Sequence, residues 1–223
     1  SPALQKNRSA QERRSMIRVF GRLFAFVFVV VSLVSCSLSL VRNNDEELFI
    51  LSPNSRVNFT RALASSSGRL LVEEPDSDPL TASSKIIFSK DSSTRGAYQY
   101  ARWSEPLPRR LNSIFVNAIG QSNLFESVAK STSVAPGDFV LSSVILDFYH
   151  DASTEPGDAV VTLQFELLND KTKKLFASKT FSYQAKLQDY SSKGAVNGFK
   201  EALSAILPQL LEWLELTISK NKK

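Results

Sequence analysis

The chain has 223 residues, 43% of them hydrophobic, and a formal net charge of +5. This length is typical of one domain or two, and the apolar content is ample for a core, which excludes a wholly disordered chain. Six of the 27 basic residues but only one of the 22 acidic residues lie in the first 35 positions, so this segment carries the whole excess charge. The neutral remainder gives no electrostatic reason to expect nucleic-acid binding.

Near its amino end the chain shows a signal-peptide pattern that starts at Met16, its only methionine. Arg18 and Arg22 precede residues 23–34, a run that is apolar except for one serine. A bilayer span needs about 20 such residues, so this shorter run is typical of the apolar region of a secretory signal peptide. Residues 1–15 are then an upstream extension, and Met16 is the expected true start.

Cys36 closes the stretch Leu33-Val34-Ser35-Cys36, which resembles the bacterial lipobox. In that motif the cysteine thiol receives a diacylglycerol and the freed amine becomes the new amino terminus, and several acyl chains on one residue give stable anchoring. The alternative is a signal anchor with a buried, inert cysteine. Ser37 is not the aspartate that commonly retains such proteins at the inner membrane. We therefore expect an outer-membrane anchor with the domain in the periplasm.

Three segments are expected: residues 1–35 as extension and signal peptide, residues 36–47 as lipidated cysteine and tether, and residues 48–223 as one periplasmic domain. Four apolar or alternating runs in the first half of that domain predict strands, at residues 48–51, 69–74, 84–90 and 97–103. The Ser-rich residues 52–68 between the first two are expected to form a loop.

The run at residues 97–103 places Tyr98, Tyr100 and Arg102 on one side of a strand and Trp103 on the other. These three residues are the candidate surface for docking a partner, because aromatic side chains beside an arginine are common in binding patches. The alternative is that Trp103 and one of the tyrosines pack under the following helix, which we favour for Trp103.

That helix is expected to start with Ser104 as N-cap and Pro106 in its first turn, and to end at Gly120. The second half predicts three strands, at residues 138–150, 158–170 and 174–186, joined as an antiparallel meander. A last helix runs from about residue 191 to 220, with Trp213 on its inner face and a kink at Pro208. The predicted fold is α+β: a mostly antiparallel sheet with an amphipathic helix after the first strands and a long C-terminal helix packed on it.

Sites for chemistry are scarce in this chain, which holds one cysteine and one histidine, His150. This excludes a disulfide framework and removes the usual ligands of a zinc site. A Ser-His-Asp triad would have to use His150, which stands near Asp147 and Asp151 at the end of a predicted strand. We interpret it as a surface or turn histidine, and expect no catalytic residue, metal site or cofactor.

Several segments in a fixed order resemble the ABC-type transport auxiliary lipoproteins, the family that includes the PqiC lipoprotein. They are "RLLVEEP" at 69–75, "YQYARWSEPLPRRL" at 98–111, "GQSNLFESV" at 120–128, "DFVLSSVILDFYHD" at 138–151, "KKLFASKTFSYQA" at 173–185 and "FKEALSAILPQLLEWL" at 199–214. The most distinctive is the aromatic-Ala-Arg-Trp sequence at 100–103, followed by a helix start between two prolines. Pro208 and residues 52–68 depart from the family pattern.

The resemblance implies a non-catalytic accessory of a lipid-trafficking system. Members accompany an ABC permease and ATPase and a periplasmic MCE-domain protein that forms a hydrophobic conduit for phospholipids, and the lipoprotein holds the outer-membrane end. Homo-oligomerisation is left open. Two other hypotheses remain from the residues: an outer-membrane assembly or lipid-carrying lipoprotein with its own apolar pocket, and a periplasmic hydrolase that would depend on His150.

Overall fold

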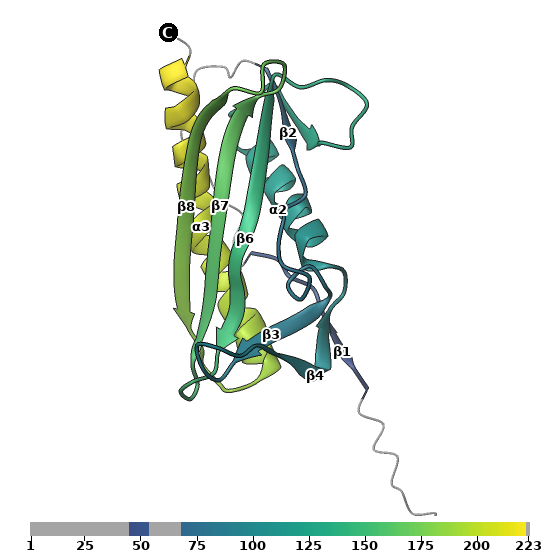
Figure 1. Cartoon of the computed structure of the whole chain (residues 1–223), viewed down its shortest axis with the longest axis vertical. Helices are drawn as coiled ribbons and strands as arrows, with labels where there is room; N and C mark the ends of the chain where they lie inside the picture. The colour runs from purple at the N-terminus through teal and green to yellow at the C-terminus, as the bar shows by residue number, and fades with distance from the viewer. Residues whose placement is uncertain (1–44, 54–67, 222–223) are drawn as a thin grey trace, which may run out of the picture. The chain divides into compact units, whose positions relative to one another are not determined.

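The computed structural model describes residues 45–53 and 68–221 (Figure 1). The expected signal peptide, the lipidation of Cys36, the sorting role of Ser37 and most of the loop at residues 52–68 lie outside the described residues. The elements in chain order are β1 (Glu47–Phe49), β2 (Arg69–Val72), β3 (Lys85–Ser89), β4 (Gly96–Trp103), α2 (Leu107–Gln121), β5 (Ser127–Lys130), β6 (Phe139–Asp151), β7 (Asp158–Asn169), β8 (Leu175–Lys186) and α3 (Ser192–Asn221). All predicted strands are confirmed, and β5 is an additional one that the sequence pattern did not indicate.

The eight strands of the described residues form one sheet. β6, β7 and β8 make the predicted antiparallel meander. The other edge of β6 carries two short strands one after the other, because β2 pairs with residues 139–141 and β3 with residues 150–151. β5 lies outside β2, and β4 and then β1 lie outside β3. The sheet is therefore three long strands extended by two separate groups of short ones.

The sheet is mixed, which corrects the expectation of a mostly antiparallel one. Four pairings are parallel (β1/β4, β2/β5, β2/β6 and β3/β6), and three are antiparallel. The reason lies in the 13-residue length of β6, along which β2 and β3 follow each other in the same direction. Asp76, in the connection between them, adds an isolated parallel bridge to Val144. The direction in which β2 and β3 pair with β6 is set by the tertiary structure, and the alternation of side chains within a strand does not indicate it.

α2 is shorter at its start and longer at its end than predicted. It begins at Leu107 and ends at Gln121, so neither Ser104 nor Gly120 is its cap. The backbone N–H of Ser104 donates instead to the carbonyl of Phe49, at 2.8 Å, which ties this residue to the end of β1. At the other end the hydroxyl of Ser122 donates to the carbonyl of Ile119, at 2.6 Å, and satisfies a helix-end acceptor without a glycine.

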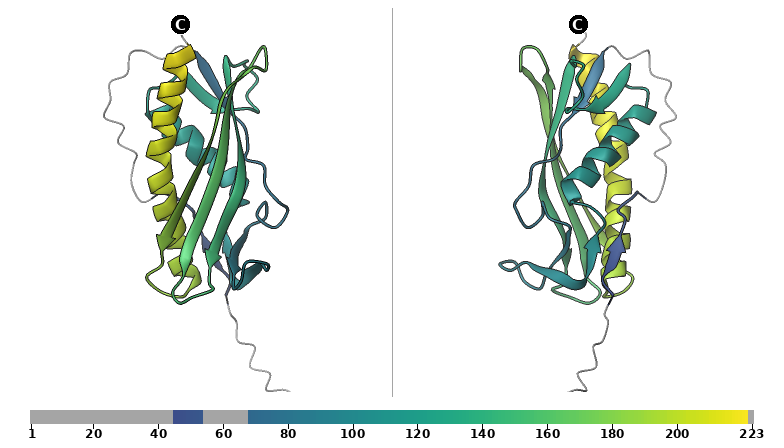
Figure 2. Two further views of the ribbon diagram at one scale, coloured as in Figure 1. Left: turned by 60° about the vertical axis from the view of Figure 1, so that its left-hand side comes forward. Right: turned by 90° about the vertical axis from the view of Figure 1, so that its right-hand side faces the viewer.

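α3 lies with α2 on one side of the long strands (Figure 2). It starts after Ser191, whose hydroxyl accepts a hydrogen bond from the N–H of Gly194 at 2.9 Å, a typical N-cap arrangement. The helix continues through Pro208 and packs on β7 and β8. Trp213 is 8% exposed, so its predicted place in the core is confirmed.

The core lies between the two helices and the meander. Four alternate residues of β7 have no exposed surface, as their spacing predicted: Val161, Leu163, Phe165 and Leu167. Phe115 of α2 packs edge-on against Phe165, with ring centroids 5.1 Å apart. Trp103 is buried, as favoured, and its ring lies edge-on to Phe148 of β6 and Phe199 of α3. The end of β4 is thus held to the main core by one large aromatic side chain.

Candidate interaction surface

The pairing of β1 with β4 divides their side chains between two faces. Leu48 lies opposite Arg102 and Phe49 opposite Trp103 in a parallel register. Paired residues of neighbouring strands point to the same side of a sheet, so Phe49 and Trp103 share the inner face. Trp103 is 3% exposed and Phe49 packs against the core. The opposite face of this pair of strands is turned to solvent.

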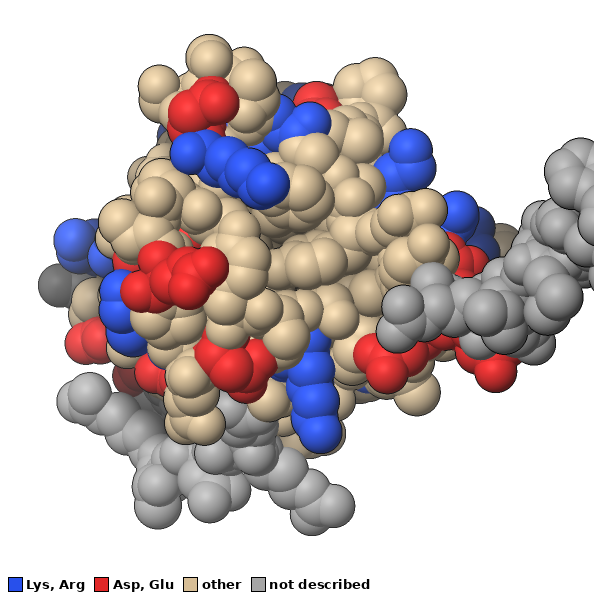
Figure 3. Space-filling model, turned by 90° about the horizontal axis from the view of Figure 1, so that it is seen from below, with Lys and Arg blue, Asp and Glu red and all other residues tan. Residues whose placement is uncertain are grey.

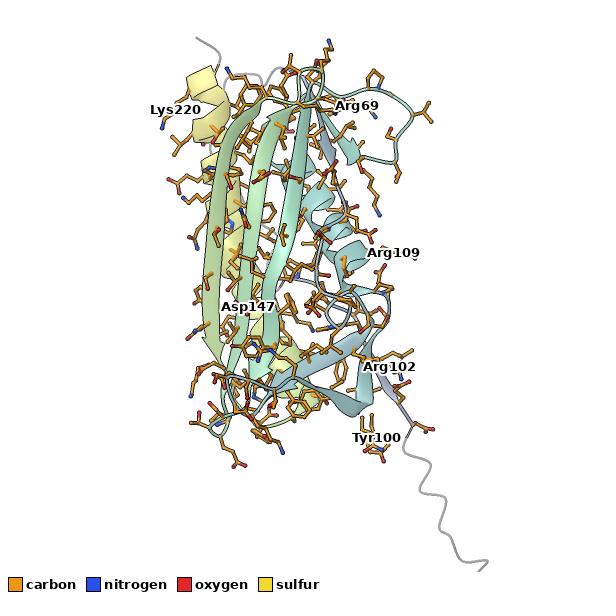
Figure 4. The ribbon with its side chains drawn as sticks, viewed as in Figure 1. Arg69, Tyr100, Arg102, Arg109, Asp147 and Lys220 are labelled. Carbon is orange, nitrogen blue, oxygen red and sulfur yellow. The ribbon has the colours of Figure 1, made fainter. Side chains whose placement is uncertain are left out.

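Three large apolar or aromatic side chains are exposed on that outer face. Leu48 is 66% exposed, Ile50 60% and Tyr100 46%. Figure 4 shows Tyr100 and Arg102 at the end of the molecule where β1 and β4 lie. β1 is also the last strand on this side of the described sheet and pairs only with β4. We call the set Glu46, Leu48, Ile50, Tyr100 and Arg102 the β1–β4 patch.

The charged residues of the β1–β4 patch neutralise each other. The Nε–H of Arg102 donates to a carboxylate oxygen of Glu46, and both side chains remain well exposed. An exposed ion pair of this kind contributes little to stability, about 0–1 kcal/mol. Its effect on the surface is to leave the patch without a net charge, so that the apolar side chains dominate its chemistry.

Tyr98, the third residue of the predicted docking surface, lies elsewhere. The pairing of β3 with β4 changes register between Lys85 and Ile87, so strict alternation does not extend from Arg102 back to Tyr98. The Tyr98 hydroxyl instead lies 2.7 Å from Nδ1 of His150. The structure therefore brings Tyr100 and Arg102 together and separates Tyr98 from them.

His150 has no exposed surface, so its interpretation as a surface or turn histidine is wrong. Its Nε2 lies 2.9 Å from the carbonyl of Pro156, which can only accept, so Nε2 carries the hydrogen and Nδ1 accepts from Tyr98. Burial lowers the pKa of His150, and it raises the pKa of Tyr98 to about 12. Both ring nitrogens are occupied by structural hydrogen bonds, and neither is left to act as a base.

A β-bulge turns His150 inward, although its place at the strand end beside Asp147 and Asp151 favoured a surface position. The register of β6 against β7 shifts between Ile145 and Asp147. One extra residue in a strand reverses which side chains face the core from that point on. Leu146 is left 49% exposed, and Phe148 and His150 turn inward. Nothing in the local sequence, where apolar residues occur on both sides, marks that insertion.

The rest of the described surface shows no assembled chemistry. Within residues 45–53 and 68–221 no group of three or more His, Cys, Asp or Glu side chains is placed to hold a metal ion. A cavity of about 320 Å³ lies beside the bulge of β6 and is lined by Asp78, Thr81, Arg95 and Asp147 among others. A second, of about 240 Å³, lies at the start of α3 and is lined mainly by polar side chains. No described helix is both long enough and apolar enough to cross a bilayer.

The comparison with protein families decides the identity of this domain. The model of the family described as the ABC-type transport auxiliary lipoprotein component matches residues 51–210. The chain belongs to this family. The match includes all of β4 and α2, the region whose sequence carried the most distinctive part of the resemblance. No curated protein matches the chain.

Solved structures share the fold of this auxiliary lipoprotein domain. The crystal structure of protein XCC0632 from Xanthomonas campestris is 22% identical, with a TM-score of 0.70, and the alignment covers 79% of this chain and 99% of that one. The crystal structure of an uncharacterized protein is 14% identical, with a TM-score of 0.61, and the alignment covers 76% and 99%. At these identities the likeness shows the fold alone.

Proposed function

We propose that this protein is a lipid-anchored, non-catalytic adaptor of an ABC-type system that moves phospholipid together with an MCE-domain protein. The observation that carries the proposal is the family match over residues 51–210, because the family is described as an auxiliary lipoprotein of ABC-type transport. The partners are an MCE-domain protein, an ABC permease and its ATPase. The adaptor stands at the outer membrane and faces the periplasm.

The proposed anchor is Cys36, acylated after cleavage of the signal peptide before it. The lipobox-like sequence at residues 33–36 supports this step, and Ser37 in the second mature position supports sorting to the outer membrane. Several acyl chains on one residue hold a protein stably, since each buried CH₂ contributes about 0.8 kcal/mol. The folded domain then needs no membrane-spanning element of its own.

A non-catalytic role agrees with the surroundings of His150. A hydrolase would need an exposed nucleophile with a base in reach. The only imidazole of the chain is buried and hydrogen-bonded at both nitrogens, to Tyr98 and to the Pro156 carbonyl. The hydrolase hypothesis therefore loses the residue on which it depended.

The alternative of a lipid-carrying protein finds no support in the two cavities described above. The larger one is lined by apolar residues such as Leu80, Ile87 and Phe148 mixed with Asp78, Arg95 and Asp147, and the smaller one mainly by polar residues, whereas an acyl chain requires a continuous apolar lining. Between the helices and the meander the space is filled by packed rings such as Phe115 on Phe165. We therefore favour the adaptor over a carrier with its own lipid pocket.

The test is affinity purification of the full-length protein from its native membranes in mild detergent, with mass spectrometry of every retained protein and of the mature amino terminus. We expect an MCE-domain protein and an ABC permease to be retained, and an acylated Cys36 at the terminus. A Cys36→Ser variant is the control, because it should fold but lose the membrane fraction. Recovery of the lipoprotein alone, or with an outer-membrane assembly machine, would contradict the adaptor role.

A further inference from the structure

We propose that the β1–β4 patch rests on the lipid surface of the membrane that holds the anchor, and so sets the orientation of the domain. The inference depends on one part of the proposed function, the acylation of Cys36. It adds what the anchor alone does not supply, because attachment at one residue does not fix the orientation of the domain. The membrane contact is assigned to Leu48, Ile50 and Tyr100.

The first argument is the chemistry of the patch. Leu48, in β1, and Ile50, just after its end, are more than half exposed, whereas Phe49 and Leu51 pack on the core, so Leu48 and Ile50 project away from it. Tyr100 stands beside them on β4 with 46% of its surface exposed. Leucine and isoleucine gain free energy on leaving water, and tyrosine favours the boundary between lipid and water because its ring is apolar and its hydroxyl polar.

The second argument is the length of chain between the anchor and the patch. Asp45, the first described residue, is nine positions after Cys36. Nine residues span at most about 30 Å when fully extended, so the amino end of β1 lies within that distance of the acylated residue. A short connection between two sites gives an effective concentration of about millimolar of one at the other. Three apolar side chains therefore suffice for a contact that would be weak between separate molecules.

The third argument is charge. Glu46 and Arg102 form an ion pair, and the exposed Lys85 lies opposite Arg102 in the sheet. Figure 3 shows the lower end of the molecule, where charges of both signs lie around a mostly uncharged centre. The surface is therefore suited to zwitterionic lipid and does not require an anionic one.

A protein partner fits this patch less well. A stable protein interface buries about 800 Å² on each partner, usually around a central cluster of anchors. The patch offers three such side chains on the outermost, three-residue strand of the sheet. With β1 against the membrane, the far end of the molecule, where α3 ends, faces away from it and is open to the transport partners (Figure 1).

The experiment uses the full-length lipoprotein, reconstituted in vesicles of phosphatidylethanolamine and phosphatidylglycerol that contain a phospholipid with a photoreactive diazirine near its headgroup. After illumination, peptide mass spectrometry locates the cross-links. We expect them in residues 45–53 and 100–102, with the same distribution in vesicles of phosphatidylcholine. The double variant Leu48→Ser, Ile50→Ser should lose labelling there by about tenfold.

The matched control is Leu216→Ser, which removes an equally apolar side chain, 53% exposed, from the other end of α3. It should leave the labelling pattern unchanged. Labelling spread over the whole surface, or unchanged by the double variant, would overturn the inference. Loss of a co-purifying protein in the double variant, with no lipid labelling of the patch in the wild type, would also overturn it and assign the patch to a protein.

The outcomes separate this inference from the proposed function. Labelling of the patch together with an acylated Cys36 but no ABC or MCE partner would refute the adaptor role and leave the membrane contact in place. Retention of the ABC and MCE partners with no labelling of the patch would refute the membrane contact and leave the adaptor role in place. An amino terminus that is not acylated at Cys36 would remove the premise of both the anchor and the contact.

Discussion

The meander β6–β8 and the β1–β4 end of the sheet are built differently. The meander consists of strands of 12 or 13 residues, antiparallel and backed by α3. The β1–β4 end has short strands joined in parallel and in irregular register, and it exposes Leu48, Ile50 and Tyr100. The exposed Leu146 and Leu175 of the meander stand singly on separate strands, whereas Leu48, Ile50 and Tyr100 belong to one pair of neighbouring strands.

The largest expected effect comes from the core that joins the two regions. Phe199 of α3 stacks on Phe148 of β6 at a centroid distance of 4.5 Å and meets Trp103 of β4 edge-on. Phe199→Ala leaves a cavity beneath both regions, and we expect a loss of about 3–5 kcal/mol in the free energy of unfolding. Denaturation in urea followed by circular dichroism measures it. A loss below about 1 kcal/mol would mean that the β1–β4 end is held independently of α3.

Tyr98→Phe tests the hydrogen bond between Tyr98 of β4 and His150 of β6, which joins the two regions. The change keeps the ring against Phe88 but removes the donor to the buried Nδ1 of His150. An unsatisfied buried acceptor costs about 1–3 kcal/mol, which is the expected drop in unfolding free energy. Tyr100→Phe is the matched control, since that hydroxyl is on the exposed patch, and it should change stability by less than about 0.5 kcal/mol. Equal effects of the two changes would contradict the role given to Tyr98.

The pH dependence of stability sharpens the same point. Burial lowers the pKa of His150 in the folded protein, so the unfolded chain binds more protons just below the ordinary histidine pKa of about 6.5. The free energy of unfolding is therefore expected to fall as the pH drops below about 6.5, and to go on falling until the pH reaches the lowered pKa of the folded state. Urea unfolding of wild type and His150→Gln in matched buffers measures this slope. The slope should be smaller in the variant, and parallel curves would show that carboxylates alone account for it.

The smallest effect is expected from the ion pair of the β1–β4 patch. Arg102→Ala removes the exposed contact with Glu46 and should change the free energy of unfolding by less than about 1 kcal/mol. The same change leaves Glu46 unpaired on the patch. Binding to vesicles that contain anionic lipid should then weaken, while the cross-links in phosphatidylcholine stay in place. A large loss of stability would mean that the β1–β4 end depends on this pair for its fold.

The sequence predicted the regular region well because side-chain pattern and burial follow one rule there. Alternation along β7 identified its buried residues, and the helical spacing of α3 identified Trp213 as core. The irregular region was predicted less well. Ser104 was predicted to be a helix cap. Its backbone N–H instead bonds to the carbonyl of Phe49, 55 residues earlier, and no local sequence pattern indicates such a distant partner.

For the candidate surface, the sequence alone pointed to Tyr100 and Arg102 and to the family, through the motif around Trp103. It did not indicate that Leu48 and Ile50 are exposed, because an apolar run is typical of a buried strand. Their exposure follows from the place of β1 at the edge of the sheet, with only one of its faces against the core. Edge position is a property of the whole sheet, and four residues of sequence do not contain it.

The sequence by itself determined the two helices and every strand except β5, the core face of the meander, the family and the scarcity of catalytic groups, because these depend on composition, local order and spacing. Only the tertiary structure decided strand direction, the inward turn of His150 and the exposure of the β1–β4 patch. Each of these depends on contacts between distant segments: two short strands sharing one edge of β6, one extra residue in β6 opposite β7, and a strand with nothing beyond it. The energies of such contacts arise only when the chain is folded.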